Sequence, residues 1–211
     1  MGDKVDFTLM YATHNALRRD LEDIARITAR TDDDPRRILA GAAGWELFKR
    51  ALHIHHTSED EALWPMLSAA LADRPDDLAV VEAMEAEHAA IDPLIDAVDA
   101  ALADRDSGPA RLGDLTDALA TKLVGHVKHE EDAALPLIER TLTLEQLQNF
   151  GSVHAAKAGP DGPRITPWML DRADEKVVAS TMALLPPPVR AAYENEWQPA
   201  YAALDRWNDR R

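Results

Sequence analysis

The sequence predicts an all-α protein in which an antiparallel up-down-up-down four-helix bundle is followed by a C-terminal helical extension. Two observations support this fold class. Apolar residues recur at spacings of three and four, which is the period of a helix with one buried face, and alternating β-branched residues are nearly absent. The chain has 211 residues, which suits one domain of about 150 residues and an appendage. We therefore expect the bundle over residues 1–143 and the extension over residues 144–211.

Four apolar stripes define the expected bundle helices. They lie within residues 7–28, 48–66, 81–102 and 119–137. The segments between the stripes are short and contain Pro or Gly, which end helices and turn the chain. Short connections favour antiparallel neighbours, and ligands from facing helices meet in the core of such a bundle.

Local signals place several helix boundaries. Asp34 followed by Pro35 is a typical helix start, so we expect the second helix to open there. Thr143 and Gln146 have the spacing of a capping box and predict a short fifth helix. The segment 158–167 is rich in Gly and Pro and is expected to be a linker.

The extension contains two further helical stretches, at about residues 173–185 and 189–207. It also contains Trp168, Trp197 and Trp207. Because large aromatic side chains are rarely left in water, we expect the extension to pack on the bundle or on a partner.

Composition excludes several functions. The net charge of -15 disfavours contact with nucleic acid or with anionic membranes. The absence of cysteine excludes disulfides, thiolate metal sites and thiol catalysis. No segment approaches the roughly 18 uninterrupted apolar residues of a membrane span, and the N-terminus does not resemble a signal peptide. We expect a cytoplasmic protein, monomeric or homodimeric, without nucleic-acid or membrane partners.

A duplicated motif carries the chemistry. Residues 55–67 align without a gap on residues 126–138, and each copy begins with His-x-x-x-Glu. One further histidine occupies a matching position on the preceding helix of each half. Residues four apart lie on the same helical face, so all of these side chains can point at one centre. The candidate metal ligands are His14, His55, Glu59, His88, His126 and Glu130.

These six residues lie within the apolar stripes, where unpaired carboxylates cost several kcal/mol each unless they bind metal. Lys122 and Lys128 fall outside the stripes and cannot pair with them. An isolated histidine in a stripe is commonly a hydrogen-bonded core residue, but four histidines and two glutamates at repeated positions favour metal. Imidazole and carboxylate ligands suit iron, manganese or zinc, and two carboxylates in a bundle favour two irons. The neighbouring acids, such as Asp60 and Glu131, are expected to be solvated.

The pattern His14, His55-x-x-x-Glu59, His88, His126-x-x-x-Glu130 resembles the hemerythrin-like family, also called the HHE cation-binding family, over roughly residues 7–142. The resemblance implies two iron ions with a bridging oxo or hydroxo group, and with Glu59 and Glu130 as bridging carboxylates. It also implies binding of, or reaction with, a small-molecule oxidant such as dioxygen, nitric oxide or peroxide. The extension resembles those of actinobacterial members.

The sequence departs from the oxygen-carrying hemerythrins at two ligand positions. Those proteins have a second histidine one turn before the third-helix ligand, where this chain has Met84, and His-x-x-x-x-Asp in the fourth helix. Two imidazoles for each iron would leave both metals five-coordinate, which favours redox reactivity over oxygen storage. Glu85 is a possible seventh ligand, although a solvated acid is the simpler interpretation. Tyr11, one turn before His14, is expected to be a core aromatic rather than a group beside the metal.

The remaining histidines are not expected to bind metal. His53 and His56 are predicted to lie at the surface or beside the site, because the counterpart of His56 in the repeat is Val127. His129 is displaced by about 100° around its helix from the neighbouring Glu130, so it is a poor co-ligand. His154 is expected to be structural or exposed.

Three functions remain open. The leading hypothesis is a di-iron protein that binds or consumes small oxidants, so an enzymatic role as an oxidoreductase that consumes peroxide or nitric oxide is possible but undecided. The second is an iron- or oxygen-responsive interaction module without turnover. The third, an iron store, is the weakest because no cage-forming signal is present. No phosphate loop, nucleophile elbow or helix-turn-helix offers another site.

Overall fold

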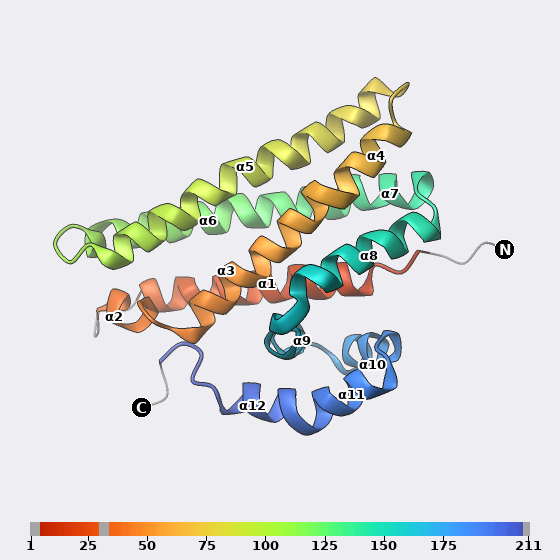
Figure 1. Ribbon diagram of the computed structural model, residues 1–211. Coiled ribbons are helices and arrows are strands. Elements are labelled where there is room, and N and C mark those ends of the chain that lie inside the picture. The colour runs from red at the N-terminus through yellow and green to blue at the C-terminus, as the bar shows by residue number, and fades with distance from the viewer. Residues whose placement is uncertain (1–4, 30–33, 209–211) are drawn as a thin grey trace.

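A computed structural model describes residues 5–29 and 34–208, and within these ranges every regular element is a helix. Four long helical segments run antiparallel to their neighbours in the chain (Figure 1). This confirms the predicted all-α bundle. The segments are α1 (Thr8–Thr28); α3 (Ala43–Ser58) continued by η1 (Glu59–Leu63) and α4 (Trp64–Ala70); α5 (Pro75–Ala103); and α6 (Gly108–His129) continued by η2 (Glu130–Ala134) and α7 (Leu135–Thr141).

The second bundle helix begins later than predicted. Asp34 accepts a hydrogen bond from the Arg36 amide at 3.0 Å and caps a separate short helix, α2 (Pro35–Leu39). Gly41 then adopts a φ of 83°, a left-handed conformation that glycine tolerates at little cost. The chain turns there, and the bundle helix starts at Ala43.

A π-helical turn interrupts the second and the fourth bundle helix at matching points of the duplicated motif. Each turn begins at a predicted glutamate ligand, Glu59 in η1 and Glu130 in η2. Pro65 and Pro136 follow at the same distance, in the first turn of α4 and α7. Proline has no amide hydrogen and clashes with the carbonyl four residues earlier, and a π turn is one way in which a helix accommodates it. The repeated proline therefore explains why both helices contain a π turn at the motif.

The buried apolar side chains form two clusters. The larger one contains Leu17 of α1, Ile54 of α3, Ile91 of α5 and Leu123 of α6, with many neighbours. The smaller one lies toward the other end of the same helices and contains Trp64, Met84 and Leu135 among others. Along α3, α5 and α6, the predicted ligands occupy positions between the two clusters. The bundle thus has a polar layer enclosed by apolar side chains on both sides.

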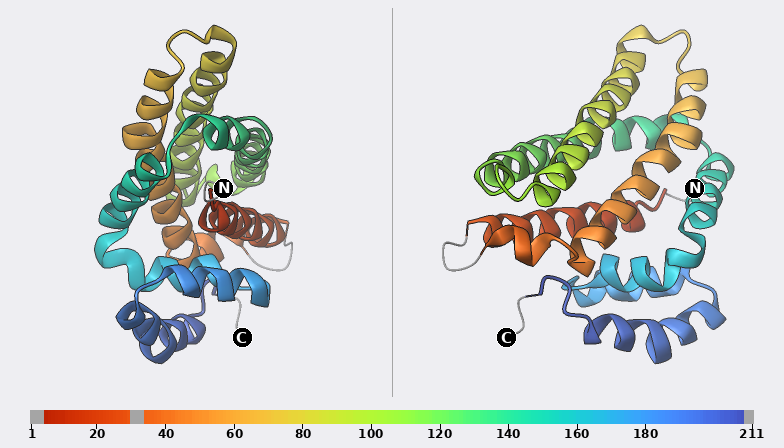
Figure 2. Two further views of the ribbon diagram at one scale, coloured as in Figure 1. Left: turned by 90° about the vertical axis from the view of Figure 1, so that its right-hand side faces the viewer. Right: turned by 60° about the vertical axis from the view of Figure 1, so that its left-hand side comes forward.

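The C-terminal extension is helical and lies along α1 and α3 (Figures 1 and 2). It consists of α8 (Leu144–Ala158), η3 (Gly159–Asp161), α9 (Gly162–Leu170), α10 (Glu175–Leu184), α11 (Pro187–Ala192), η4 (Tyr193–Trp197) and α12 (Gln198–Ala203). The predicted capping box of Thr143 and Gln146 is present at the start of α8. The expected linker over 158–167 is wrong, because this segment forms η3 and the first two turns of α9. Pro160 and Pro163 stand in first-turn positions that need no amide donor, and Pro167 lies inside α9.

Two of the three tryptophans attach the extension to α1. Trp168 is completely buried and its indole N–H donates to Asp20 at 2.7 Å, while Trp207 is 4% exposed and donates to Asp23 at 3.1 Å. Trp197 is only partly buried. The division of the chain at residue 143 stays a prediction, and residues 1–4, 30–33 and 209–211 of the two expected units lie outside the described ranges.

No helix within residues 5–29 and 34–208 has both the length and the apolar character that a bilayer crossing requires.

Candidate metal centre

The structure brings the six predicted ligands into the polar layer of the bundle. Each has at most 3% of its surface exposed, and each long helical segment contributes at least one of them. Single histidines come from the first and third segments, and one His-x-x-x-Glu pair comes from each of the others. The six are His14 on α1, His55 and Glu59 at the junction of α3 and η1, His88 on α5, and His126 and Glu130 at the junction of α6 and η2.

The four histidines form two pairs with equal separations. His14 Nε2 lies 3.1 Å from His55 Nε2, and His88 Nε2 lies 3.1 Å from His126 Nε2. Two imidazoles that bind one ion side by side, at about 2.1 Å and at about 90° to each other, have nitrogens about 3.0 Å apart. The separation within each pair therefore fits one metal ion per pair.

Each glutamate lies between the two histidine pairs. Glu59 has one oxygen 3.2 Å from His55 Nδ1 and the other 3.5 Å from His88 Nε2. Glu130 Oε2 is 3.1 Å from His14 Nε2 and 3.9 Å from His126 Nε2. Each carboxylate thus contacts one histidine of each pair, which is the arrangement expected of a bridging ligand.

The carboxylates have no other partner. Both oxygens of Glu59 and both oxygens of Glu130 are buried, and none makes a hydrogen bond within the described part of the chain. Buried polar atoms are nearly always hydrogen-bonded, and an unsatisfied buried group costs about 1–3 kcal/mol. Oxygen and imidazole donors that converge without partners fit cation binding, so the residues present suit the metal that the sequence implies.

Three acids accept hydrogen bonds from histidine nitrogens that face away from the centre. Glu131 accepts from His14 Nδ1 at 2.9 Å, Asp60 from His88 Nδ1 at 2.8 Å, and Glu87 from His126 Nδ1 at 2.9 Å. A carboxylate at Nδ1 fixes the tautomer that leaves Nε2 free to bind metal. The expectation that Asp60 and Glu131 are merely solvated acids is therefore wrong. Glu87 was not recognised in the sequence.

Two of these acids have further partners of their own. Arg18 donates two hydrogen bonds to Glu131, at 2.9 and 2.7 Å, in a bidentate pair. His129, which is not a ligand, donates to Glu87 at 2.8 Å. Arg18, one turn further along α1 than His14, therefore holds Glu131 in the position from which Glu131 orients His14.

The electrostatics of the protein without an ion reflect the burial of these groups. Burial raises the pKa of Glu59 well above its ordinary value, and the nearby Glu130 carboxylate raises it further. Burial lowers the pKa of His14, but Glu130 and Glu131 outweigh it and raise that pKa to about 9. Burial also raises the pKa of Glu131, but its hydrogen bonds to His14 and Arg18 lower it to about 2. Without an ion the layer therefore favours protons on Glu59 and on His14, and a bound cation would take the place of these protons.

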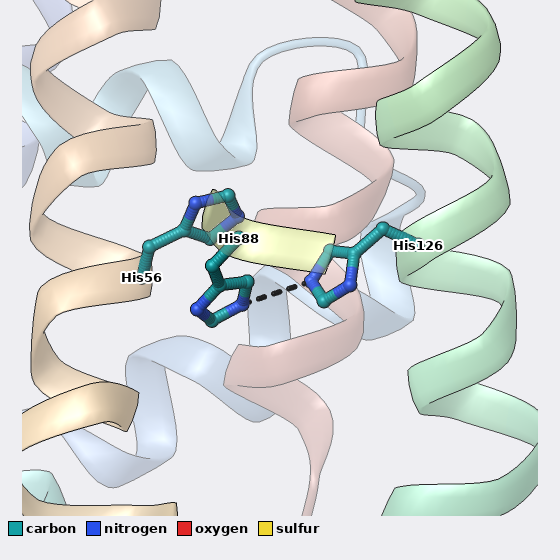
Figure 3. Close-up of side chains that lie close together, drawn as sticks. All are labelled: His56, His88 and His126. Carbon is teal, nitrogen blue, oxygen red and sulfur yellow. Dashed lines mark hydrogen bonds between the residues drawn. The ribbon is translucent and has the colours of Figure 1, made fainter. Parts of the chain in front are cut away.

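One histidine at the centre was not predicted to be there. His56 is only 4% exposed, so of its two expected positions, at the surface or beside the site, the structure excludes the first. Its ring stacks on His88 with a centroid distance of 3.8 Å (Figure 3), and His56, His88 and His126 each have a nitrogen within 4.8 Å of the others. A second such group consists of His14, His55 and Glu130. The duplicated motif did not point to His56, because the residue at the matching position of the second copy is Val127.

The other candidates lie away from the layer or contribute no polar atom to it. Glu85 is exposed, which fits the solvated acid that the sequence favoured over a seventh ligand. Tyr11 is 43% exposed, so its expected place in the core is wrong. Met84 is fully buried in the smaller apolar cluster. His53 is exposed and His154 is partly buried, as the sequence predicted for residues outside the ligand set.

The fold and the site define a four-helix bundle with a buried layer of histidines and carboxylates that is suited to metal. The family model of the hemerythrin HHE cation binding domain matches residues 5–138. The chain belongs to this family. No similar protein was found among curated proteins or among solved structures.

Proposed function

We propose that the chain binds two iron ions, joined by an oxo or hydroxo group, and that this centre binds or reacts with a small oxidant such as dioxygen, nitric oxide or peroxide. The ligands would be His14, His55, Glu59, His88, His126 and Glu130. The observation that carries this proposal is that each buried glutamate lies between two histidine pairs and has no other partner. Bound iron would supply the electron transfer that a small oxidant requires.

The chain's own residues would prepare the site for this role. Glu131, Asp60 and Glu87 hold three imidazoles in one tautomer, so little reorganisation is needed when an ion binds. The two apolar clusters enclose the layer and limit its contact with water. Burial of both glutamates keeps the ligand oxygens from hydrogen-bonding to solvent instead of metal. These features favour a small, uncharged reactant over a large substrate.

A second candidate function follows from α1, which carries both a proposed metal ligand and the residues that bind the extension. This helix carries His14 and, two turns later, Asp20 and Asp23, which accept hydrogen bonds from the tryptophans of the extension. A change in metal occupancy at His14 would therefore act on the helix that holds the extension. The alternative is an iron- or oxygen-responsive module that changes its surface without turnover.

The decisive experiment follows the iron-loaded, anaerobically reduced protein by optical and Mössbauer spectroscopy while dioxygen, nitric oxide or peroxide is added. The proposal predicts the signals of a coupled iron pair and a defined change with at least one oxidant. Repeated cycles with a reductant and the oxidant distinguish turnover from binding. Spectra of isolated mononuclear iron that none of the three oxidants alters would contradict the proposal.

A further inference from the structure

The ring of His56 lies inside the centre, although the duplicated motif gives it no role. It extends from α3 toward the pair formed by His88 and His126 (Figure 3). Its centroid is 3.8 Å from that of His88, with nearly parallel planes, and 5.3 Å from that of His126, with nearly perpendicular planes. A nitrogen of each ring lies within 4.8 Å of a nitrogen of the other two. One nitrogen of each ring is therefore close enough to the other two for the three to share one ion.

The nitrogens of His56 have no hydrogen-bond partner among the described residues. Both Nδ1 and Nε2 are buried, and neither makes a hydrogen bond. In contrast, His14, His88 and His126 each have Nδ1 bound to a carboxylate and Nε2 directed at the centre. A structural histidine in a core normally satisfies at least one ring nitrogen, because an unsatisfied polar group costs about 1–3 kcal/mol. Stacking on His88 alone does not satisfy either nitrogen.

We propose that His56 is a third imidazole ligand of the metal held by His88 and His126. This inference rests on the proposed dinuclear function and adds a ligand that the repeat does not contain. It makes the two halves of the centre unequal, with three imidazoles around one metal and two around the other. The sequence-based expectation of two equivalent metals is then replaced by two sites of different affinity.

A direct test counts the bound imidazoles in the full-length protein loaded with cobalt(II) in place of iron. Each imidazole that binds cobalt through one nitrogen carries a strongly shifted, solvent-exchangeable N–H signal in proton NMR. The proposal predicts five such signals, one for each histidine of the two groups. Four signals would overturn it. This measurement uses the unaltered chain, so it does not depend on whether a variant folds.

Variants then test which residue gives the fifth signal. His56→Gln keeps a buried polar side chain of similar size, and His53→Gln is the matched control, because His53 lies on the same helix and is exposed. We expect His56→Gln to lose one shifted signal and to weaken one of two cobalt binding steps by at least about 10- to 100-fold, the loss typical when a metal ligand loses only its hydrogen-bonded partner. His53→Gln should change neither.

The outcomes separate the two proposals. Two unchanged binding steps in His56→Gln would overturn the role of His56 while leaving the dinuclear centre in place. Binding of only one cobalt by the unaltered protein would contradict the dinuclear function itself, and the role of His56 with it.

Discussion

Replacing Glu59 by methionine should have opposite effects on the protein with and without metal. Without metal, Glu59 is a fully buried carboxylate whose two oxygens have no hydrogen-bond partner. Methionine has a similar length, favours helices and needs no partner. We therefore expect Glu59→Met to stabilise the metal-free fold and to abolish the stabilisation that metal provides.

The structure sets the magnitude of this effect. An unsatisfied buried polar group lowers the free energy of unfolding by about 1–3 kcal/mol, so its removal should raise that free energy by about the same amount. For a chain of this size, 1 kcal/mol shifts Tm by roughly 2–4 °C. In the other direction, metal present at about 100 times its Kd stabilises a binding protein by about 2.7 kcal/mol, and the variant should lose most of this shift.

The stabilisation of the metal-free protein by Glu59→Met should also depend on pH. Burial and Glu130 raise the pKa of Glu59 in the folded protein, so the folded state binds more protons than the unfolded state between the ordinary and the raised pKa. The stability of the metal-free protein therefore falls as pH rises through this window. The advantage of Glu59→Met should be small near pH 4 and should grow as pH increases.

The assay is thermal unfolding, followed by circular dichroism and calorimetry, of chelator-treated and metal-loaded protein. Asp20→Leu is the matched control, since Asp20 is equally buried but is bound to Arg19, Trp168 and Arg206 at 2.8, 2.7 and 3.0 Å. Loss of a partnered buried charge is expected to destabilise both forms by about 3–5 kcal/mol. If Glu59→Met lowers the Tm of the metal-free protein as Asp20→Leu does, Glu59 is not an uncompensated carboxylate and the reasoning fails.

Two other predictions concern the support of His14 and the docking of the extension. Glu131→Gln removes the carboxylate that orients His14 and should weaken metal binding about 10- to 100-fold while the fold persists. A cobalt titration measures the affinity and circular dichroism checks the fold. Unchanged affinity would refute this role of Glu131. Gly44→Ala would place a Cβ 2.8 Å from the Trp207 ring and should destabilise the protein by about 1–3 kcal/mol and expose the extension to proteolysis. Gly113→Ala is the control, because nothing lies within 4 Å of the added Cβ, and in this helix interior the change should stabilise the protein by about 0.5–1 kcal/mol. Equal effects of the two substitutions would contradict the docking of Trp207 on the bundle.

The bundle and its central layer could be predicted because both depend on helical periodicity. The spacing of three and four determines which face of each helix is buried, and the repeated His-x-x-x-Glu places two ligands on that face. The π turns were also encoded, because Pro65 and Pro136 stand at matching positions, but their effect on Glu59 and Glu130 was not read from the sequence.

The remaining features depend on packing between helices, which periodicity does not specify. His56 reaches the centre because its ring, which extends from α3, stacks on the ring of His88 on α5. The contacts of Glu131 and Glu87 with histidines cross from one helix to another, and in the sequence these acids look like any solvated charge. The docking of Trp168 and Trp207 onto α1 joins residues far apart in the chain and leaves no local pattern.

The most direct test of the central claim is the number of iron ions that the full-length chain binds. The protein would be loaded anaerobically with iron(II), freed of excess metal, and assayed for iron and protein in the same sample. Two histidine pairs joined by two glutamates predict saturation close to two irons per chain. Saturation at one iron, with no second ion bound at any concentration, would contradict the account.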